Sequence, residues 1–278
     1  MSKAAKKLGQ KFDSEGFVVI RSLISSRKIS EVTAAYDRLM RRSQVSDYFG
    51  PKGSRCLKDY LGLEPEMDVL VDHPDILSVT ASIDGLPALY TGAGALWYML
   101  DDVPWHCDGR PGRTGMPIKV SLYLDVLTKE CGAFRLLPGS HIPSRSMQLM
   151  KEFGVWTDNR PRIHPDIPRP LSGEVVVETE PGDVVFWDNR IWHSAPRRLD
   201  GLGRRAIFVN YIRDPRDDKS AARDLRDDVA DTLRNRTRQF IYPRQMATEV
   251  NWPRQRTIQR LLELKVPGVI ETNPTPSD

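Results

Sequence analysis

The segment IKVSLYLDV, residues 118–126, alternates apolar and polar side chains. In an extended chain, successive side chains point to opposite faces, so Lys119, Ser121 and Tyr123 share one face and isoleucine, valine and leucine share the other. Short runs of similar β character recur from residue 89 to residue 212, separated by Gly, Pro and Asp clusters: LWYML, AFRLLP, EVVVETE, DVVFWD and RAIFVNYI. This pattern predicts an all-β core, either a sandwich or a barrel.

Helical segments are predicted on both sides of this core. Residues 17–20 (FVVI) predict a short strand, and Ser25 or Ser26 can cap the helix that follows. Residues 43–63 predict a loop, and the segment HPDILSVTASI predicts a short helix. We therefore expect a single domain over residues 1–278, with a helical part (1–88), a β core (89–213) and a charged helical extension (214–278).

Composition limits the classes of function. The chain has 41 Lys and Arg against 37 Asp and Glu, and this interspersed charge does not predict a partner nucleic acid. No segment has the apolar length of a signal peptide or membrane span, which predicts a cytoplasmic protein with no membrane partner. Three cysteines without CxxC spacing argue against a disulfide framework or a thiolate zinc site. Oligomeric state is not predicted by any of these features.

The segment VPWHCDG, residues 103–109, places His106 and Asp108 on one face of an extended chain and Cys107 on the other. A His-x-Asp pair alone occurs often by chance. Three further segments follow it in order: GAFRLLPGSH at 132–141, PGDVVFWDNRIWHSAPRR at 181–198 with His193, and GRRAIFVNYI at 203–212 with two arginines. The combination is far more specific than any single motif.

In this order the motifs closely resemble the phytanoyl-CoA dioxygenase family of iron(II)- and 2-oxoglutarate-dependent oxygenases. The resemblance implies a mainly β fold with flanking helices around a double-stranded β-helix (jelly-roll, cupin-like) core. It also implies that His106, Asp108 and His193 bind iron, and that Arg204 holds the distal carboxylate of 2-oxoglutarate. Two imidazoles and one carboxylate on one face of octahedral iron leave three positions open, two for the oxoacid and one for O2.

Alternation separates the two adjacent arginines. Arg204 shares a face with Phe208, whereas Arg205 points to the other face, so only one of them can point at the iron. Lys119, Ser121 and Tyr123 are further candidate contacts for 2-oxoglutarate or the substrate, and Tyr98 is another. A solvent-facing polar stripe is the alternative interpretation of residues 118–126. Where many family members carry Gly-Ser after the second histidine, this chain carries Ser194-Ala195.

Residues 142–172 are rich in proline and too long for an ordinary connection, so we expect a lid over the pocket. An anionic or polar small-molecule substrate is suggested by arginines near the strand ends and the lid, at positions 110, 113, 135, 160 and 162. We expect His141 to be structural, His73 and His164 to be ordinary surface or loop residues, and Cys107 to pack in the core.

The expected activity is hydroxylation of an unactivated C–H bond, with release of succinate and CO2. A desaturase, an epimerase or a cyclising oxygenase would use the same cofactors, and the sequence does not separate them. A non-catalytic cupin-like binding protein, or a zinc protein with the same three ligands, is the alternative from another class. Succinate release on iron titration would discriminate between them.

Overall fold

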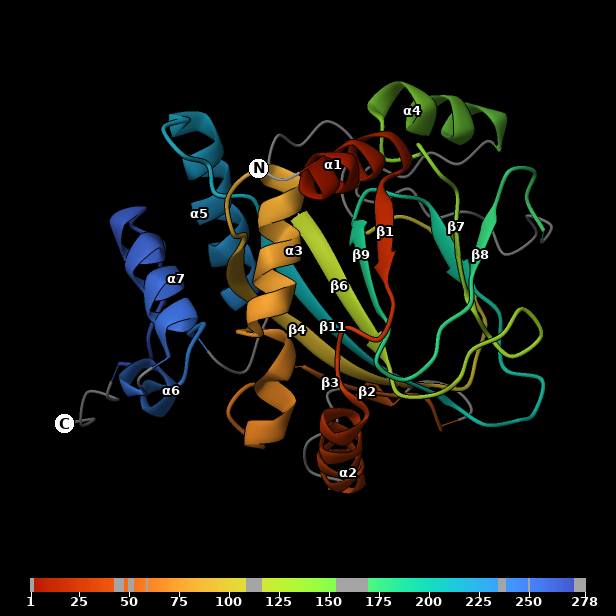
Figure 1. The fold of residues 1–278 in the computed structure, drawn as a ribbon, viewed down its shortest axis with the longest axis horizontal. Helices are drawn as coiled ribbons and strands as arrows, with labels where there is room; N and C mark the ends of the chain where they lie inside the picture. Colours follow the sequence, from red (N-terminus) through yellow and green to blue (C-terminus); the bar gives the residue numbers. More distant parts are fainter. Residues whose placement is uncertain are drawn as a thin grey trace.

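The computed structural model describes residues 3–42, 48–49, 53–58, 60–108, 117–153, 170–234, 239–249 and 251–272. Two antiparallel sheets form its centre (Figure 1). The seven-stranded sheet has the order β1 (Phe17–Ile20), β9 (Val184–Asp188), β6 (Pro117–Tyr123), β11 (Arg204–Ile212), β4 (Leu89–Met99), β3 (Arg55–Lys58) and β2 (Tyr48–Phe49). The four-stranded sheet has the order β5 (Val103–His106), β10 (His193–Ala195), β7 (Phe134–Leu136) and β8 (Val175–Val177). Together they form a double-stranded β-helix, as predicted.

Helices surround the two sheets. Before the core come α1 (Lys3–Glu15), α2 (Ser26–Arg41), the 3-10 helix η3 (Pro65–Leu70) and α3 (Pro74–Asp84). After it come α5 (Lys219–Arg234), α6 (Arg244–Thr248) and α7 (Trp252–Glu263), while α4 (Pro143–Glu152) follows β7. Figure 1 shows α3, α5 and α7 on one side of the seven-stranded sheet and β7 and β8 on the other. None of the helices in the described ranges is long and apolar enough to cross a membrane.

The alternation in β6 divides the interior into two cores. Ile118, Val120 and Leu122 face the helices and are fully buried there. Burying each such side chain contributes roughly 1.5–3 kcal/mol, so this face fixes the strand in its register. The opposite face of the same strand, with Tyr123, packs between the two sheets. The polar stripe predicted from the sequence therefore points into the β-helix.

Several elements were not predicted individually: α1, β2, β3, η3, α4 and α6. β2 and β3 lie within residues 43–63, which we expected to be loop, and β3 pairs with β4 through backbone hydrogen bonds. These strands are too short to show a clear alternation, so the tertiary pairing decides their conformation. Helix α1 also went unnoticed, because only Gly9 and Phe12 are buried among its lysines. Of the predicted lid, residues 154–169 lie outside the described residues.

Candidate active site

The three predicted metal ligands come together where β5 and β10 pair. His106 is the last residue of β5, His193 is the first of β10, and the two lie directly opposite each other. Asp108 follows β5, and its backbone N–H donates to the carbonyl of Asn189 at 2.9 Å. One nitrogen or oxygen atom from each of the three side chains lies within 4.8 Å of the others. One strand pairing thus joins ligands that are far apart in the sequence.

Backbone carbonyls orient both imidazoles. Nδ1 of His106 lies 2.8 Å from the carbonyl oxygen of Pro104, and Nδ1 of His193 lies 2.9 Å from that of Ile191. A carbonyl only accepts, so each Nδ1 carries the proton and each Nε2 keeps its lone pair for a metal. Burial and the neighbouring His106 lower the pKa of His193 to about 3, which keeps this imidazole neutral. Neutral imidazole is the form that binds metal.

Asp108 completes the set. Its Oδ1 lies 3.5 Å from Nε2 of His106, and its Oδ2 lies 3.9 Å from Nε2 of His193 and 2.5 Å from Nζ of Lys119. Burial opposes its charge, but Lys119 and the two histidines outweigh burial and hold the pKa of Asp108 well below its usual value. Two Nε2 lone pairs and one carboxylate turned towards each other fit the facial donor set of non-haem iron(II).

The ligands open into a cavity of about 190 Å³. Besides the three ligands, its polar lining consists of Lys119, Tyr123 and Arg204. The remaining wall is apolar: Trp97, Met99, Val103, Phe134, Trp187, Ala195 and Phe208. A few convergent polar groups within an apolar enclosure are typical of small-molecule sites.

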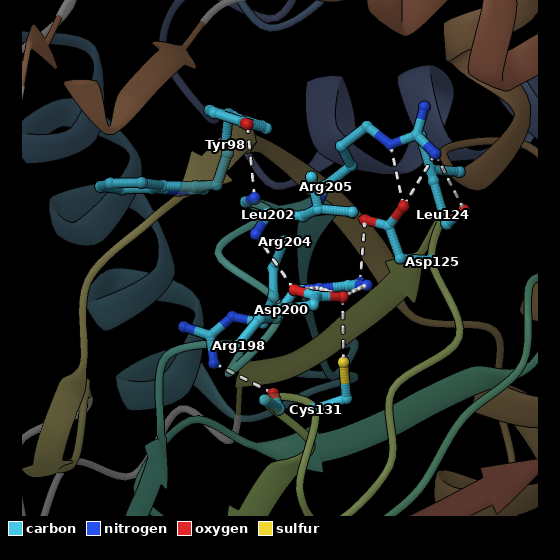
Figure 2. Close-up of polar contacts among 12 residues, drawn as sticks. Tyr98, Leu124, Asp125, Cys131, Arg198, Asp200, Leu202, Arg204 and Arg205 are labelled. Atoms are coloured by element: carbon cyan, nitrogen blue, oxygen red, sulfur yellow. Dashed lines mark hydrogen bonds and ion pairs between the residues drawn. The ribbon is translucent and has the colours of Figure 1, made fainter. Parts of the chain in front are cut away.

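Arg204 enters this cavity, whereas Arg205 does not. Arg204 is 1% exposed, and its Nη1 donates to the carbonyls of Gly132 at 3.0 Å and Pro196 at 2.6 Å. These neutral acceptors orient the guanidinium without neutralising its charge. Figure 2 shows Arg205 turned to Asp125, whose Oδ1 accepts from Nη2 at 2.7 Å and from Nε at 3.0 Å. Alternation along β11 accounts for this divergence, as predicted.

Two other candidate contacts lie outside the cavity lining. Ser121 faces inward, but its hydroxyl accepts a hydrogen bond from Nε1 of Trp187 at 2.7 Å and the indole covers it. Tyr98 lies opposite Arg205 in the β4–β11 pairing, and its hydroxyl accepts from the backbone N–H of Gly203 at 3.3 Å (Figure 2). The geometry therefore supports neither as a contact for the cosubstrate. Lys119 does line the cavity.

The two residues next to Tyr98 in the sequence line the cavity, where Tyr98 itself was predicted to lie. Trp97 and Met99 lie on the cavity side of β4, one residue to either side of Tyr98. The sequence analysis missed both, because β4 contains no charged residue that fixes which face is inside. Phe208 could have been identified, since it shares the face of Arg204.

Residues expected to be structural have structural surroundings. His141 is buried, with Nε2 3.1 Å from the carbonyl oxygen of Asp13. His73 caps α3 by accepting from the backbone N–H of Asp75. Cys107 is buried beside Trp105 in a separate apolar cluster.

Of the arginines suggested to attract an anionic substrate, Arg135 is paired with Glu174, so its charge is already balanced. Positions 110, 113, 160 and 162, and His164, lie outside the described residues. The described part of the chain thus gives no support to the arginine argument for substrate charge.

Comparison with solved structures supports the fold. The epimerase SnoN, in complex with Fe3+, alpha-ketoglutarate and nogalamycin RO, is 20% identical, with a TM-score of 0.61 over 76% of this chain and 84% of that one. The carbocyclase SnoK from nogalamycin biosynthesis is 21% identical, with a TM-score of 0.58 over 77% and 85%. EctD from S. alaskensis, with 2-oxoglutarate and 5-hydroxyectoine, is 18% identical, with a TM-score of 0.57 over 77% and 79%.

Sequence comparison identifies the family. No curated protein matches the chain. The family model of phytanoyl-CoA dioxygenase matches residues 12–206, a span that includes all three ligands and Arg204. The chain therefore belongs to the phytanoyl-CoA dioxygenase family and is an iron- and 2-oxoglutarate-dependent oxygenase.

Proposed function

We propose that this protein hydroxylates an unactivated C–H bond of a small molecule, with 2-oxoglutarate and O2 as cosubstrates and succinate and CO2 as by-products. One observation carries the proposal: His106, Asp108 and His193 line the same small cavity as Arg204. A metal-binding face and a buried cation in one enclosure can hold the two ends of a dicarboxylate. Bound iron supplies the activation of O2.

The protein's own groups bind, orient and exclude water. His106 and His193 present Nε2 because their Nδ1 protons are held by backbone carbonyls. Arg204 is fixed by the carbonyls of Gly132 and Pro196, so its guanidinium is already oriented when a carboxylate arrives. Its planar fork can donate two parallel hydrogen bonds to that carboxylate.

The aromatic wall has two consequences. Phe134 and Phe208, like the neighbouring Val103, offer no hydrogen bonds in place of water, so a bound substrate is held in an apolar enclosure. An apolar wall also suits a substrate that presents an aliphatic C–H bond to the metal face. Within the described part of the chain, the polar groups of the cavity are the three ligands, Lys119, Tyr123 and Arg204.

Epimerisation and ring closure form the second candidate. Two of the structures that this fold resembles are described as an epimerase and a carbocyclase. A third structure, EctD, contains 5-hydroxyectoine. These reactions share the cosubstrate and differ in the fate of the substrate after hydrogen is removed. A facial set of two histidines and one carboxylate suits all of them.

Succinate release separates an enzyme from a binding protein. The purified protein is titrated with iron(II) in the presence of 2-oxoglutarate, O2 and ascorbate, and small carboxylates, phosphates and neutral polar metabolites are screened as stimulants. We expect succinate to rise with iron, and more strongly with a true substrate. The His193→Ala variant is the control. Iron-independent or absent succinate formation would contradict the proposal.

The product then identifies the reaction. With 18O2, a hydroxylated product gains one labelled oxygen atom. An isomer of unchanged mass indicates epimerisation, and a product lighter by two hydrogen atoms indicates ring closure or desaturation. Either of the last two results would refute hydroxylation but would still agree with an iron- and 2-oxoglutarate-dependent oxygenase.

A further inference from the structure

Lys119 is a confined cation inside the cavity. It comes from the middle of β6, where it lies opposite Trp187 of β9 and Asn210 of β11. Its Nζ lies 4.8 Å from the ring centre of Trp187 and 5.0 Å from that of Phe208, and its side chain is 18% exposed. The two rings restrict the directions in which the ammonium group can point. They favour its charge as well, through cation–π attraction.

The ammonium group distinguishes the two oxygens of Asp108. Nζ lies 2.5 Å from Oδ2, the distance of a charge-assisted hydrogen bond. Oδ1 lies closer to the histidines, 3.5 Å from Nε2 of His106, whereas Oδ2 lies 3.9 Å from Nε2 of His193. The backbone of Asp108 is held by its hydrogen bond to Asn189, so only the side-chain torsions can change which oxygen faces the histidines.

We propose that Lys119 is a positioning residue that holds Oδ2, so that Asp108 binds the metal through Oδ1 alone. The proposal rests on the proposed iron- and 2-oxoglutarate-dependent function. A carboxylate can bind a metal through one oxygen or through both. Binding through both would fill one of the three positions that the oxoacid and O2 require. Lys119 then protects the open coordination of the site and is not itself a contact for 2-oxoglutarate.

This role differs from the sequence prediction, which placed Lys119 among the contacts for the cosubstrate. A direct contact would leave the metal site unchanged until 2-oxoglutarate binds. A positioning residue alters the metal site before 2-oxoglutarate is added. The two roles are therefore separable by a measurement on the metal-loaded protein alone.

The probe is Mn(II), which accepts the same nitrogen and oxygen ligands and needs no turnover to be detected. Bound Mn(II) accelerates the relaxation of water protons in proportion to the number of water molecules on the ion. Three protein donor atoms leave three positions for water. In Lys119→Met, Oδ2 is free to replace one water, so we expect the inner-sphere enhancement at Mn(II) saturation to fall by about one third.

Three further variants sharpen the test. Lys119→Arg keeps a cationic donor and should recover most of the enhancement. Lys129→Met makes the same chemical change at an exposed lysine and should match the wild type. Should Lys119→Met fail to fold by circular dichroism, Lys119→Leu takes its place, because leucine also has no donor for Oδ2, and the same fall is expected.

Steady-state kinetics give a second readout. Lys119→Met should lower kcat for succinate formation at least tenfold and change the dissociation constant of 2-oxoglutarate less than threefold, because the lost position is the one that O2 needs. Arg204→Lys should do the reverse.

The possible outcomes distinguish a wrong role for Lys119 from a wrong proposed function. Equal enhancement in wild type and Lys119→Met would overturn the assignment of Lys119. A change confined to the affinity for 2-oxoglutarate would overturn it too, and would restore the direct contact. If the wild type itself binds no Mn(II), the proposed function fails, whatever the variants do.

Discussion

Replacing Arg204 by lysine tests the cosubstrate site most directly. The substitution keeps the positive charge but removes the planar fork that can donate two parallel hydrogen bonds to one carboxylate. In the structure, Nη1 already donates to the carbonyls of Gly132 and Pro196, so the guanidinium reaches the cavity in one fixed orientation. A lysine ammonium has three donors, so with two of them on these carbonyls only one is left for a carboxylate oxygen.

The expected loss is that of one charge-assisted hydrogen bond. Such a bond contributes about 1.5–3 kcal/mol, and every 1.4 kcal/mol corresponds to a factor of ten in affinity. We therefore expect Arg204→Lys to raise the dissociation constant of 2-oxoglutarate about 10- to 200-fold. Calorimetry on the Mn(II)-loaded protein measures this constant without turnover.

Arg205→Lys is the matched control. Arg205 pairs with Asp125 and with Asp37, at 3.4 Å, on the face of β11 away from the cavity. Lysine there should leave the affinity for 2-oxoglutarate unchanged and lower the free energy of unfolding by about 1 kcal/mol, since one hydrogen bond of a partly exposed pair is lost. If Arg205→Lys loses the cosubstrate and Arg204→Lys does not, the register of β11 is wrong by one residue.

Three further predictions concern the candidate metal ligands, the turn at Gly132 and the buried Asp68. His106→Ala, Asp108→Ala and His193→Ala should each weaken iron binding and abolish succinate formation, because two remaining ligands cannot replace the third; full turnover in any of them would contradict the site. Gly132→Ala should destabilise the protein and weaken 2-oxoglutarate binding, because φ is +76° and a Cβ would lie 2.9 Å from Cγ of Arg198 and 3.2 Å from Cδ of Arg204; wild-type affinity would contradict the role of this turn. Burial raises the pKa of Asp68 from 3.8 to about 7, so the folded state holds a proton that the unfolded state has released, and stability should fall as pH rises from about 4 to about 7. Asp68→Asn, which mimics the protonated form, should remove this fall and gain on the order of 3 kcal/mol at pH 8, measured by urea unfolding; an unchanged pH dependence would refute it.

The sequence was sufficient to predict that the three candidate ligands come together and which side of β11 faces inward. His106 and Asp108 are separated by one residue in an extended segment, and the period of a strand places them together without further information. Arg204 could be assigned to the inner face of β11 in two steps. Alternation places Arg204 and Arg205 on opposite faces, and the family spacing indicates which face is inside. Both inferences depend only on local geometry.

The walls of the cavity required the tertiary structure. Both faces of β4 carry apolar side chains: Trp97 and Met99 line the cavity, and Leu96 is buried against the helices. Alternation cannot say which face of such a strand is inside. The prediction of Tyr98 failed here by a single residue. Ser121 was correctly placed on the inner face, but only the structure shows that Trp187 covers it.

The position of β10 shows the effect of having Ser194-Ala195 where many family members carry Gly-Ser. His193 and Ala195 share the cavity face of this strand, and Ser194 points away from it and is fully buried. The methyl group of Ala195 therefore stands in the wall, where it offers no hydrogen bond to a carboxylate. Of the polar groups in the described wall, Tyr123 on β6 lies opposite Ala206 of β11, two residues from Arg204 on the same face of that strand. Because Ala195 donates no hydrogen bond, the proposed contact with the distal carboxylate depends more heavily on Arg204, and we expect the effect of Arg204→Lys to lie towards the upper end of its range.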